Sequence, residues 1–442
     1  MTRFARFLLS VCGVLALSAC SSWLGEDEPD PLPGERLSVM QMQGSLEASG
    51  AAAKSEKFVM PPAWTNEFWP QAGGYSNHAM QNLDMSFDPL KRVWSADIGA
   101  GSSTRVPLTA QPILVDGKIY ALDTDSDLSA FDAQTGKRLW RVSVGSQEED
   151  ETVLGGGLAF SAGTLLVTNG YAELLALGPD DGQVIWRVPL PAPARAAPTV
   201  LDGRVFVVTM DQRLSTFDLR DGKLLWNYQG IAEGAGLLGA AAPAANHEIV
   251  IAPFSSGEIF ALRVENGSVA WGDNLAPPLR IGGASGLSDI RALPVIDNGL
   301  VIAVSYGGRI VAIDERTGQR VWQRDFGGLE TPWVAGTHLF ALSSENQLVA
   351  LSRTTGAIAW VLQLDRFEDE KNREGPIVWT GPILAGGRLI LTGTDGRLVE
   401  VKPEDGTVLR RGDLAETPAV PMLVANKTLY VLSKDGTLSA WK

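Results

Sequence analysis

The stretch "QPILVDGKIYALDTDSDLSAFDAQTGKRLW", from Gln111 to Trp140, carries the pattern that decides the fold. A proline precedes the first apolar segment, an Asp-Gly pair separates it from the second, and a glycine lies four residues before the final tryptophan. Asp-Gly and Thr-Gly pairs between alternating apolar segments are typical of tight β-hairpins, where glycine adopts a positive φ. The stretch therefore predicts a small antiparallel sheet of short strands.

The glycine–tryptophan pair recurs along the whole chain. Its copies are Gly136/Trp140, Gly182/Trp186, Gly222/Trp226, Gly267/Trp271, Gly318/Trp322 and Gly356/Trp360. A further copy keeps Gly406 but has Arg410 in the tryptophan register, and Trp94 lies upstream of the first full unit. The mean spacing is about 45 residues, a period typical of four-stranded propeller blades. Because a repeated aromatic residue at one register suits packing between blades, we assign these tryptophans to the core rather than to a cofactor site.

The two ends of the repeat predict how the array closes. The last unit, from Pro421 to Trp441, contains three strands and no fourth, whereas Leu90 to Ile98 provides a single strand at the other end. Pairing these two ends would remove both open sheet edges. We therefore expect an all-β fold over residues 62–442: a single eight-bladed β-propeller of four-stranded antiparallel blades, closed by an N-terminal strand.

The first twenty residues have the composition of a secretory signal. Arg3 and Arg6 precede the apolar run from Phe7 to Leu17, which is too short to span a bilayer as a stable helix. The run ends in Leu-Ser-Ala-Cys20, which resembles the bacterial lipobox, in which the cysteine is lipidated after cleavage. We predict a lipoprotein signal peptide over residues 1–19, lipidation at Cys20 and a flexible tether over residues 20–61. The alternative is an ordinary signal peptide, with Cys20 incidental.

Composition limits the class of partner. The chain has 442 residues, of which 45% are hydrophobic, and its 37 basic against 51 acidic side chains give a net charge of −14. This balance is typical of a folded body and lacks the basic surface that nucleic-acid binding requires. We therefore expect no nucleic-acid partner.

The sequence offers little for catalysis or metal binding. Both cysteines lie in the first twenty residues, and the three histidines are widely separated. The one acidic run, Asp123, Asp125 and Asp127, lacks the glycine and distal glutamate of an EF-hand loop, so we expect a solvated hairpin. No phosphate-binding or nucleophile motif is present. We predict no catalytic residue, no metal and no cofactor.

The repeat also carries a family resemblance. The unit Ala-Phe/Ile-Asp-x-x-Thr-Gly-x-x-x-Trp, seen in Ala130 to Trp140 and Ala312 to Trp322, resembles the repeat of the pyrroloquinoline-quinone (PQQ) enzymes. Combined with the lipobox and the eightfold array, it more closely resembles the BamB family, lipoproteins of the outer-membrane β-barrel assembly machinery. The resemblance implies a non-enzymatic scaffold at the periplasmic face of the outer membrane, which assists unfolded outer-membrane proteins together with other assembly subunits. A PQQ-dependent dehydrogenase-like enzyme or a small-molecule-binding propeller remains the alternative.

Two connections between blades are candidates for partner binding. The family contacts POTRA domains of BamA through a leucine/arginine loop and an Asp-x-Asp loop, which the resemblance places at Leu237 and Leu238 and at Asp289 and Arg291. Leu238 and Arg291 depart from the family residues. The residues of 272–293 favour the same location, because interleaved apolar and charged side chains on one exposed loop suit a protein interface. The alternative is that both loops only link blades. The densely charged insertion at residues 365–375 is expected to be a solvated loop.

Overall fold

The computed structural model describes residues 46–49, 57–146, 155–194, 196–231, 241–276, 289–414 and 416–442. Leu237, Leu238 and Cys20 therefore lie outside the described residues. The chain divides into two compact units, residues 1–46 and 47–442, and every strand named below belongs to the second.

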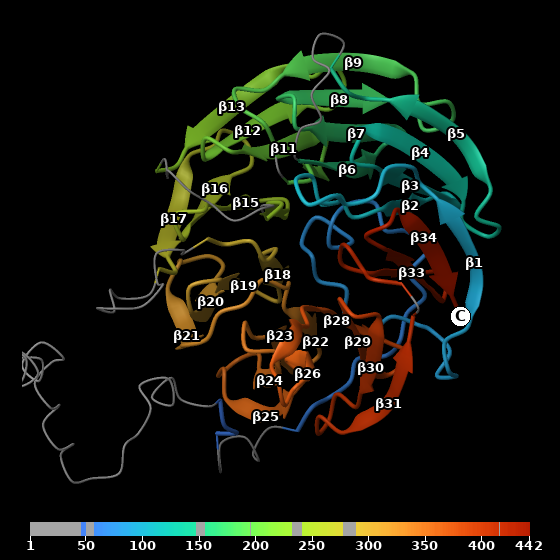
Figure 1. The fold of residues 1–442 in the computed structure, drawn as a ribbon. Coiled ribbons are helices and arrows are strands. Elements are labelled where there is room, and N and C mark those ends of the chain that lie inside the picture. The colour runs from blue at the N-terminus through green and yellow to red at the C-terminus, as the bar shows by residue number, and fades with distance from the viewer. Residues whose placement is uncertain are drawn as a thin grey trace, which may run out of the picture. The chain divides into compact units, whose positions relative to one another are not determined.

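Eight four-stranded antiparallel sheets are arranged as blades around a ring (Figure 1), which confirms the predicted propeller. Blade 1 contains β2 (Ile113–Val115), β3 (Lys118–Leu122), β4 (Asp127–Asp132) and β5 (Arg138–Ser143). Blade 2 contains β6 (Gly156–Ser161), β7 (Thr164–Asn169), β8 (Glu173–Leu177) and β9 (Val184–Pro189). Blade 3 contains β10 (Thr199–Leu201), β11 (Arg204–Thr209), β12 (Arg213–Asp218) and β13 (Leu224–Gln229). Blade 4 contains β14 (Ala244–Ala245), β15 (Ile249–Pro253), β16 (Glu258–Arg263) and β17 (Val269–Asn274).

The second half of the chain repeats the same order. Blade 5 contains β18 (Val295–Asp297), β19 (Leu300–Ser305), β20 (Arg309–Asp314) and β21 (Arg320–Arg324). Blade 6 contains β22 (Trp333–Ala335), β23 (His338–Leu342), β24 (Gln347–Ser352) and β25 (Ile358–Gln363). Blade 7 contains β28 (Trp379–Ala385), β29 (Arg388–Gly393), β30 (Arg397–Val401) and β31 (Val408–Asp413), preceded by a hairpin of β26 (Phe367–Asp369) and β27 (Glu374–Pro376). Blade 8 contains β32 (Leu423–Ala425), β33 (Thr428–Leu432), β34 (Thr437–Trp441) and β1 (Arg92–Asp97).

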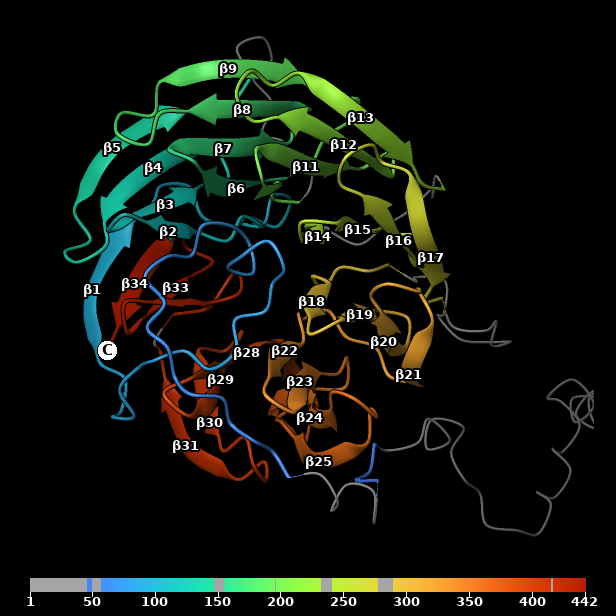
Figure 2. The ribbon, with the colours of Figure 1, turned by 180° about the vertical axis from the view of Figure 1, so that it is seen from behind.

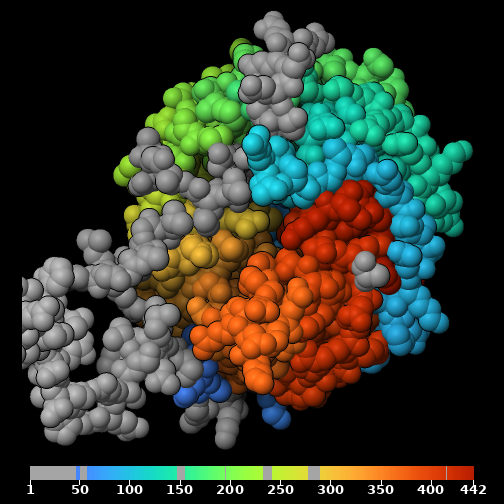
Figure 3. Space-filling view, viewed as in Figure 1, coloured from blue at the N-terminus to red at the C-terminus, as the bar shows by residue number. Residues whose placement is uncertain are grey.

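The N-terminal strand closes the ring, as predicted. β1 pairs antiparallel with β34, with Trp94 opposite Ala440, and the backbone of Lys91 exchanges two hydrogen bonds with that of Lys442. The light-blue residues that include β1 lie against the red C-terminal blade (Figure 3). The closing blade therefore takes its outer strand from one end of the repeat and its other three strands from the opposite end.

The repeated tryptophans join neighbouring blades. Each of the seven donates its indole N–H to a backbone carbonyl of the next blade over 2.7–3.2 Å, the acceptors being Ala133, Pro179, Leu219, Val264, Glu315, Arg353 and Pro403. The turn glycine of that next blade packs against the indole, so that a methyl group at Gly318 would lie 2.5 Å from Trp271 Cβ. Because the turn backbone lies directly on the indole, there is no room for a side chain at this glycine. The packing role assigned to these tryptophans is confirmed.

The interface between blades 7 and 8 is built differently. Arg410 occupies the tryptophan register, opposite Glu400 on β30. Glu400 lies between Arg388 Nε at 3.0 Å and Arg410 Nη1 at 3.2 Å, and both Arg388 and Glu400 are fully buried. Both guanidinium groups lie over the Phe87 ring, at 5.3 and 5.1 Å from its centroid. An ion cluster on an aromatic ring therefore replaces the tryptophan–glycine contact at this interface, which we call the arginine seam.

Residues 57–91, the hub segment, cross the interior of the ring and bond to all eight blades (Figures 1 and 2). Backbone or side-chain hydrogen bonds join Trp69 to Leu114, Pro70 to Phe160, Gln71 to Val200, Ser76 to Ala245, Asn77 to Ile296, Gln81 to Trp333, Leu83 to Leu384 and Asn66 to Asn426. These partners lie on or beside the innermost strand of each blade. Repeat analysis did not predict this segment, because its contacts are irregular and lie far apart in sequence.

Contacts with the ring extend into the predicted tether. Phe58 packs edge-on against Phe340, and Val59 donates its N–H to Thr337 Oγ1 over 3.0 Å. Ser49 donates its N–H to the Ile358 carbonyl, and its hydroxyl accepts the Ile358 N–H, both over 2.9 Å. The domain boundary at residue 62 stays a prediction. Over the described residues, no helix is long and apolar enough to cross a membrane.

Candidate functional site

Of the predicted partner-binding residues, Asp289 and Arg291 are described, and they lie at the end of the ring that carries the connections between blades and the turns between each second and third strand. Asp289 and Arg291 precede β18 of blade 5. Arg291 is exposed, whereas Asp289 is only 4% exposed and its carbonyl accepts the Tyr306 N–H over 2.9 Å. Asp289 is therefore not the exposed loop residue that the sequence pattern suggested, since Ile290 and Ala292 turn this part of the connection into the core. The binding role of both residues stays a prediction.

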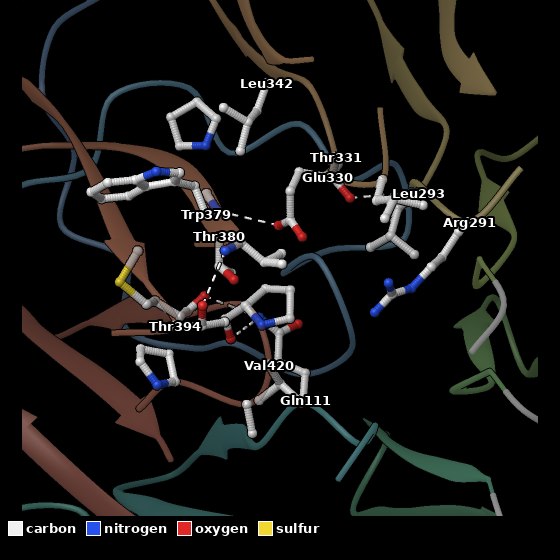
Figure 4. Close-up of a pocket in the computed structure, with 18 of the residues that line it drawn as sticks. Gln111, Arg291, Leu293, Glu330, Thr331, Leu342, Trp379, Thr380, Thr394 and Val420 are labelled. Atoms are coloured by element: carbon white, nitrogen blue, oxygen red, sulfur yellow. Dashed lines mark hydrogen bonds between the residues drawn. The ribbon is translucent and has the colours of Figure 1, made fainter. Parts of the chain in front are cut away.

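A cavity of about 630 Å³ opens next to Arg291 (Figure 4). Its floor is formed by the hub segment through Trp69, Gly73 and His78. Its walls come mainly from blades 5 to 8 and are largely apolar, with Leu293, Leu342, Trp379, Val420 and Met422 among the lining residues. The cavity occupies the centre of the propeller, because the inner strands cannot meet there and the hub segment fills only one end.

Glu330 is the acidic group of this cavity. It precedes β22, and its Oε2 accepts the Gly381 N–H over 3.2 Å. Burial raises the pKa of Glu330, while the Arg291 guanidinium and the Gly381 hydrogen bond oppose that rise. Figure 4 shows the Glu330 carboxylate and the Arg291 guanidinium facing the same space. Both side chains are described, and no ion pair joins them.

Two polar groups hold the floor in place. Gln111 accepts the Gly73 N–H through Oε1 and donates through Nε2 to the carbonyls of Pro421 and Met422, over 2.9–3.1 Å. His78 Nδ1 lies 2.7 Å from the Pro294 carbonyl, so this nitrogen carries the proton. Burial lowers the pKa of His78 to about 4, and its Nε2 has no partner among the described residues. The histidine is therefore neutral at pH 7.

The charged insertion of blade 7 borders the cavity. Residues 365–375, expected as a solvated loop, are mostly exposed but form most of the β26–β27 hairpin, and Phe367 lines the cavity. Asp365 Oδ2 accepts from Arg397 over 2.9 Å and from Arg411 over 3.2 Å, which ties the hairpin to its blade. The apolar residues Phe367, Ile377 and Trp379 around the charged run were the available signal for this fold-back.

The acidic run of blade 1 is a structural turn between β3 and β4. Asp123 Oδ1 accepts the N–H groups of Asp125 and Asp127, and Oδ2 pairs with Arg141 at 2.8 Å. Burial raises the pKa of Asp123, so the expectation of a solvated hairpin is wrong for this residue. The Arg141 guanidinium lies where a cation would sit. Across the described ranges, no group of three metal-ligating side chains is found.

The fold and the repeat define an eight-bladed propeller of the PQQ-like class. The family model described as "Outer membrane protein assembly factor BamB" matches residues 79–152 and 124–362, and the chain belongs to this family. BamB of Yersinia pestis is 25% identical over 368 residues, which cover 82% of this chain and 91% of that protein. The assignment places the chain with assembly factors rather than dehydrogenases, in agreement with the prediction of a non-enzymatic protein.

Solved structures support the same fold. The crystal structure of BamB from Moraxella catarrhalis has a TM-score of 0.64 at 20% identity, covering 80% of this chain and 98% of that chain. A europium-containing methanol dehydrogenase also has a TM-score of 0.64, at 13% identity, covering 83% of this chain and 89% of that chain. At such low identity, these likenesses concern the fold alone.

Proposed function

We propose that this protein is a scaffold of the outer-membrane β-barrel assembly machinery, which assists the delivery and insertion of outer-membrane proteins through contact with POTRA domains of BamA. The observation that supports it most is the family match over residues 79–362. The relatives that are named as assembly factors also match this chain along most of their length. A rigid ring that presents loops at one end suits this role, because loops on a fixed scaffold commonly carry binding residues.

The proposed partner surface joins the connections before β14 and β18. The two connections occupy equivalent places in neighbouring blades, before Pro243 and Pro294, so that Leu237 and Arg291 would belong to one surface. Arg291 is exposed and is of a residue type that is enriched at interface hot spots. Because Asp289 is buried, we assign it to holding the loop rather than to direct contact.

Isothermal titration against purified POTRA domains tests this surface. We expect Arg291→Glu to weaken the complex by at least about tenfold, the loss typical of a central charged contact. Arg316→Glu makes the same charge change in the exposed turn between β20 and β21 of blade 5. This turn lies at the opposite end of the ring, so the affinity should stay unchanged. Leu237→Ala should also weaken binding, with melting temperatures as the folding control. Equal affinities for both arginine variants would contradict the proposed surface.

The membrane anchor is a separate part of the proposal. Two or more acyl chains on Cys20 would hold the protein at the periplasmic face of the outer membrane, whereas a single chain binds only marginally. We expect mass spectrometry of the mature protein to find an acylated N-terminal Cys20, and Cys20→Ser to release a folded protein from the membrane fraction. An unmodified N-terminus at another residue would refute the anchor.

A further inference from the structure

The central cavity is lined by two groups of opposite charge, Glu330 and Arg291, that form no ion pair with each other. The Glu330 carboxylate uses one oxygen to accept the Gly381 N–H, and Arg291 faces it from the other side without forming an ion pair. The surrounding walls are largely apolar. Glu330 is only partly exposed, and a carboxylate shielded from water is costly unless donors satisfy it, so an occupant with a donor on the Glu330 side would be stabilised here.

We propose that the cavity binds a segment of an extended polypeptide, placing one bulky apolar side chain against Trp379, Leu342 and Val420 and the adjoining peptide group between Glu330 and Arg291. The peptide N–H would donate to the Glu330 carboxylate, and the peptide carbonyl would accept from the Arg291 guanidinium. The choice of a polypeptide rests on the proposed function, because an assembly factor handles unfolded chains.

The dimensions and polarity of the cavity support this occupant. A volume of about 630 Å³ lies within the range of roughly 300–1,000 Å³ that holds drug-sized molecules, which suits a side chain with its neighbouring backbone. Leu342, Trp379 and Val420 line this wall and are 5%, 1% and 4% exposed, so the wall offers a bulky apolar side chain a closely packed apolar surface. The hub segment closes the other end, so a chain would enter and leave by the same mouth. The raised pKa of Glu330, caused mainly by its removal from water, agrees with a carboxylate that has a single hydrogen-bond donor within the described part of the chain.

Fluorine NMR of short peptides tests the proposal with the whole protein. The probe is an acetylated, amidated tripeptide Ser-Phe-Ser with 4-fluorophenylalanine in the centre, and the comparison peptide has a fluorinated aliphatic residue of small volume instead. We expect line broadening that saturates with the aromatic probe and little with the small one. Glu330→Gln keeps the shape of the wall and removes its charge, and it should weaken probe binding by about tenfold, since hydrogen bonds to charged groups are roughly twice as strong.

A plugged cavity provides the matched control. Ser344 is exposed at the mouth, so Ser344→Trp should abolish broadening without unfolding the protein, whereas Gln134→Trp, in an exposed turn of blade 1, should leave it intact. Broadening that persists in folded Ser344→Trp, or no broadening with the wild type, would overturn the proposal. Titration of POTRA domains and of the probe into the wild-type protein separates the two ideas: peptide binding without POTRA affinity would refute the proposed function alone, and POTRA affinity without peptide binding would refute the cavity alone.

Discussion

The tryptophan–glycine interfaces and the arginine seam solve the same packing problem with different chemistry. At seven interfaces, an indole lies on the turn glycine of the next blade and donates to a carbonyl beside it. In blade 8, the outer strand that pairs with β34 is β1, from residues 92–97, so no hairpin turn joins its third and fourth strands. A tryptophan at position 410 would have no glycine turn to pack against.

The substitutions at the seam therefore come as a set. Arg410 donates through Nη2 to the Phe87 carbonyl over 2.7 Å, which replaces the indole N–H contact with the next blade. Glu400 stands opposite it, where the other blades have alanine or threonine, and Arg388 completes the cluster. The difference teaches that the tryptophan register depends on the neighbouring turn, and that where the chain is interrupted a charged cluster can hold the ring instead.

The largest effect is expected from removing β1, the strand that completes blade 8 and closes the ring next to the arginine seam. Deleting the mature chain through Ile98 removes both β1 and the hub segment, which opens blade 8 and exposes two sheet edges. We expect loss of cooperative thermal unfolding and aggregation. Deletion through residue 56 retains all contacts of the hub segment and serves as control. Similar melting curves for the two truncations would contradict the role assigned to closure.

The seam itself should be sensitive to the loss of one charge. Arg388→Met leaves Glu400 buried with only Arg410 beside it, and removing one partner of a buried ion pair costs about 3–5 kcal/mol of unfolding free energy. Adding Glu400→Leu should recover most of this loss, since a buried pair replaced by apolar residues is often neutral. Urea titration of the single and double variants measures both. A double variant as unstable as the single one would show that the cluster acts by shape and not by charge.

Acid should weaken the hub segment, which bonds to the blades on both sides of the seam. The pKa of His78 is about 4 in the folded protein, below its usual value near 6.5, so the unfolded state binds the proton more readily. Stability from this group is complete above pH 6.5 and falls as the pH drops to about 4, by about 3 kcal/mol. His78→Asn suits the left-handed backbone at this position, where φ is 59°, and should flatten that pH dependence. An unchanged slope in urea titrations between pH 7 and pH 4.5 would assign the acid sensitivity elsewhere.

The smallest effect isolates the indole–glycine contact. Gly318 and Gly203 both have a φ of 73°, but a methyl group would clash with Trp271 at Gly318 and meet nothing within 4 Å at Gly203. Alanine at either position therefore has the same backbone strain, and only Gly318→Ala adds overpacking, which costs about 1–3 kcal/mol. The difference between their unfolding free energies measures the contact. Equal values would mean that the indole can shift without cost.

Sequence periodicity predicted the blades, the inter-blade tryptophans and the closing strand, because these depend on short-range turn chemistry and on counting strands. It did not predict the placement of Asp289 or the fold-back of residues 365–375. Both depend on which neighbouring residues are buried, and a stretch that mixes charged and apolar side chains does not indicate which of them point into the core. No sequence pattern identified Glu330 as a candidate, since a single acidic residue before a strand belongs to no motif with a defined spacing.

What the sequence alone determined is the repeat and its eightfold number, since each unit carries its own turn glycine and packing residue. Only the tertiary structure decided that residues 57–91 bond to every blade, that Arg388, Glu400 and Arg410 meet at Phe87, and that Glu330 faces Arg291 across a cavity. Each of these arrangements joins residues from different blades or from opposite ends of the chain. The physical reason is that closing the ring creates both the seam and the central space, and no local pattern encodes either.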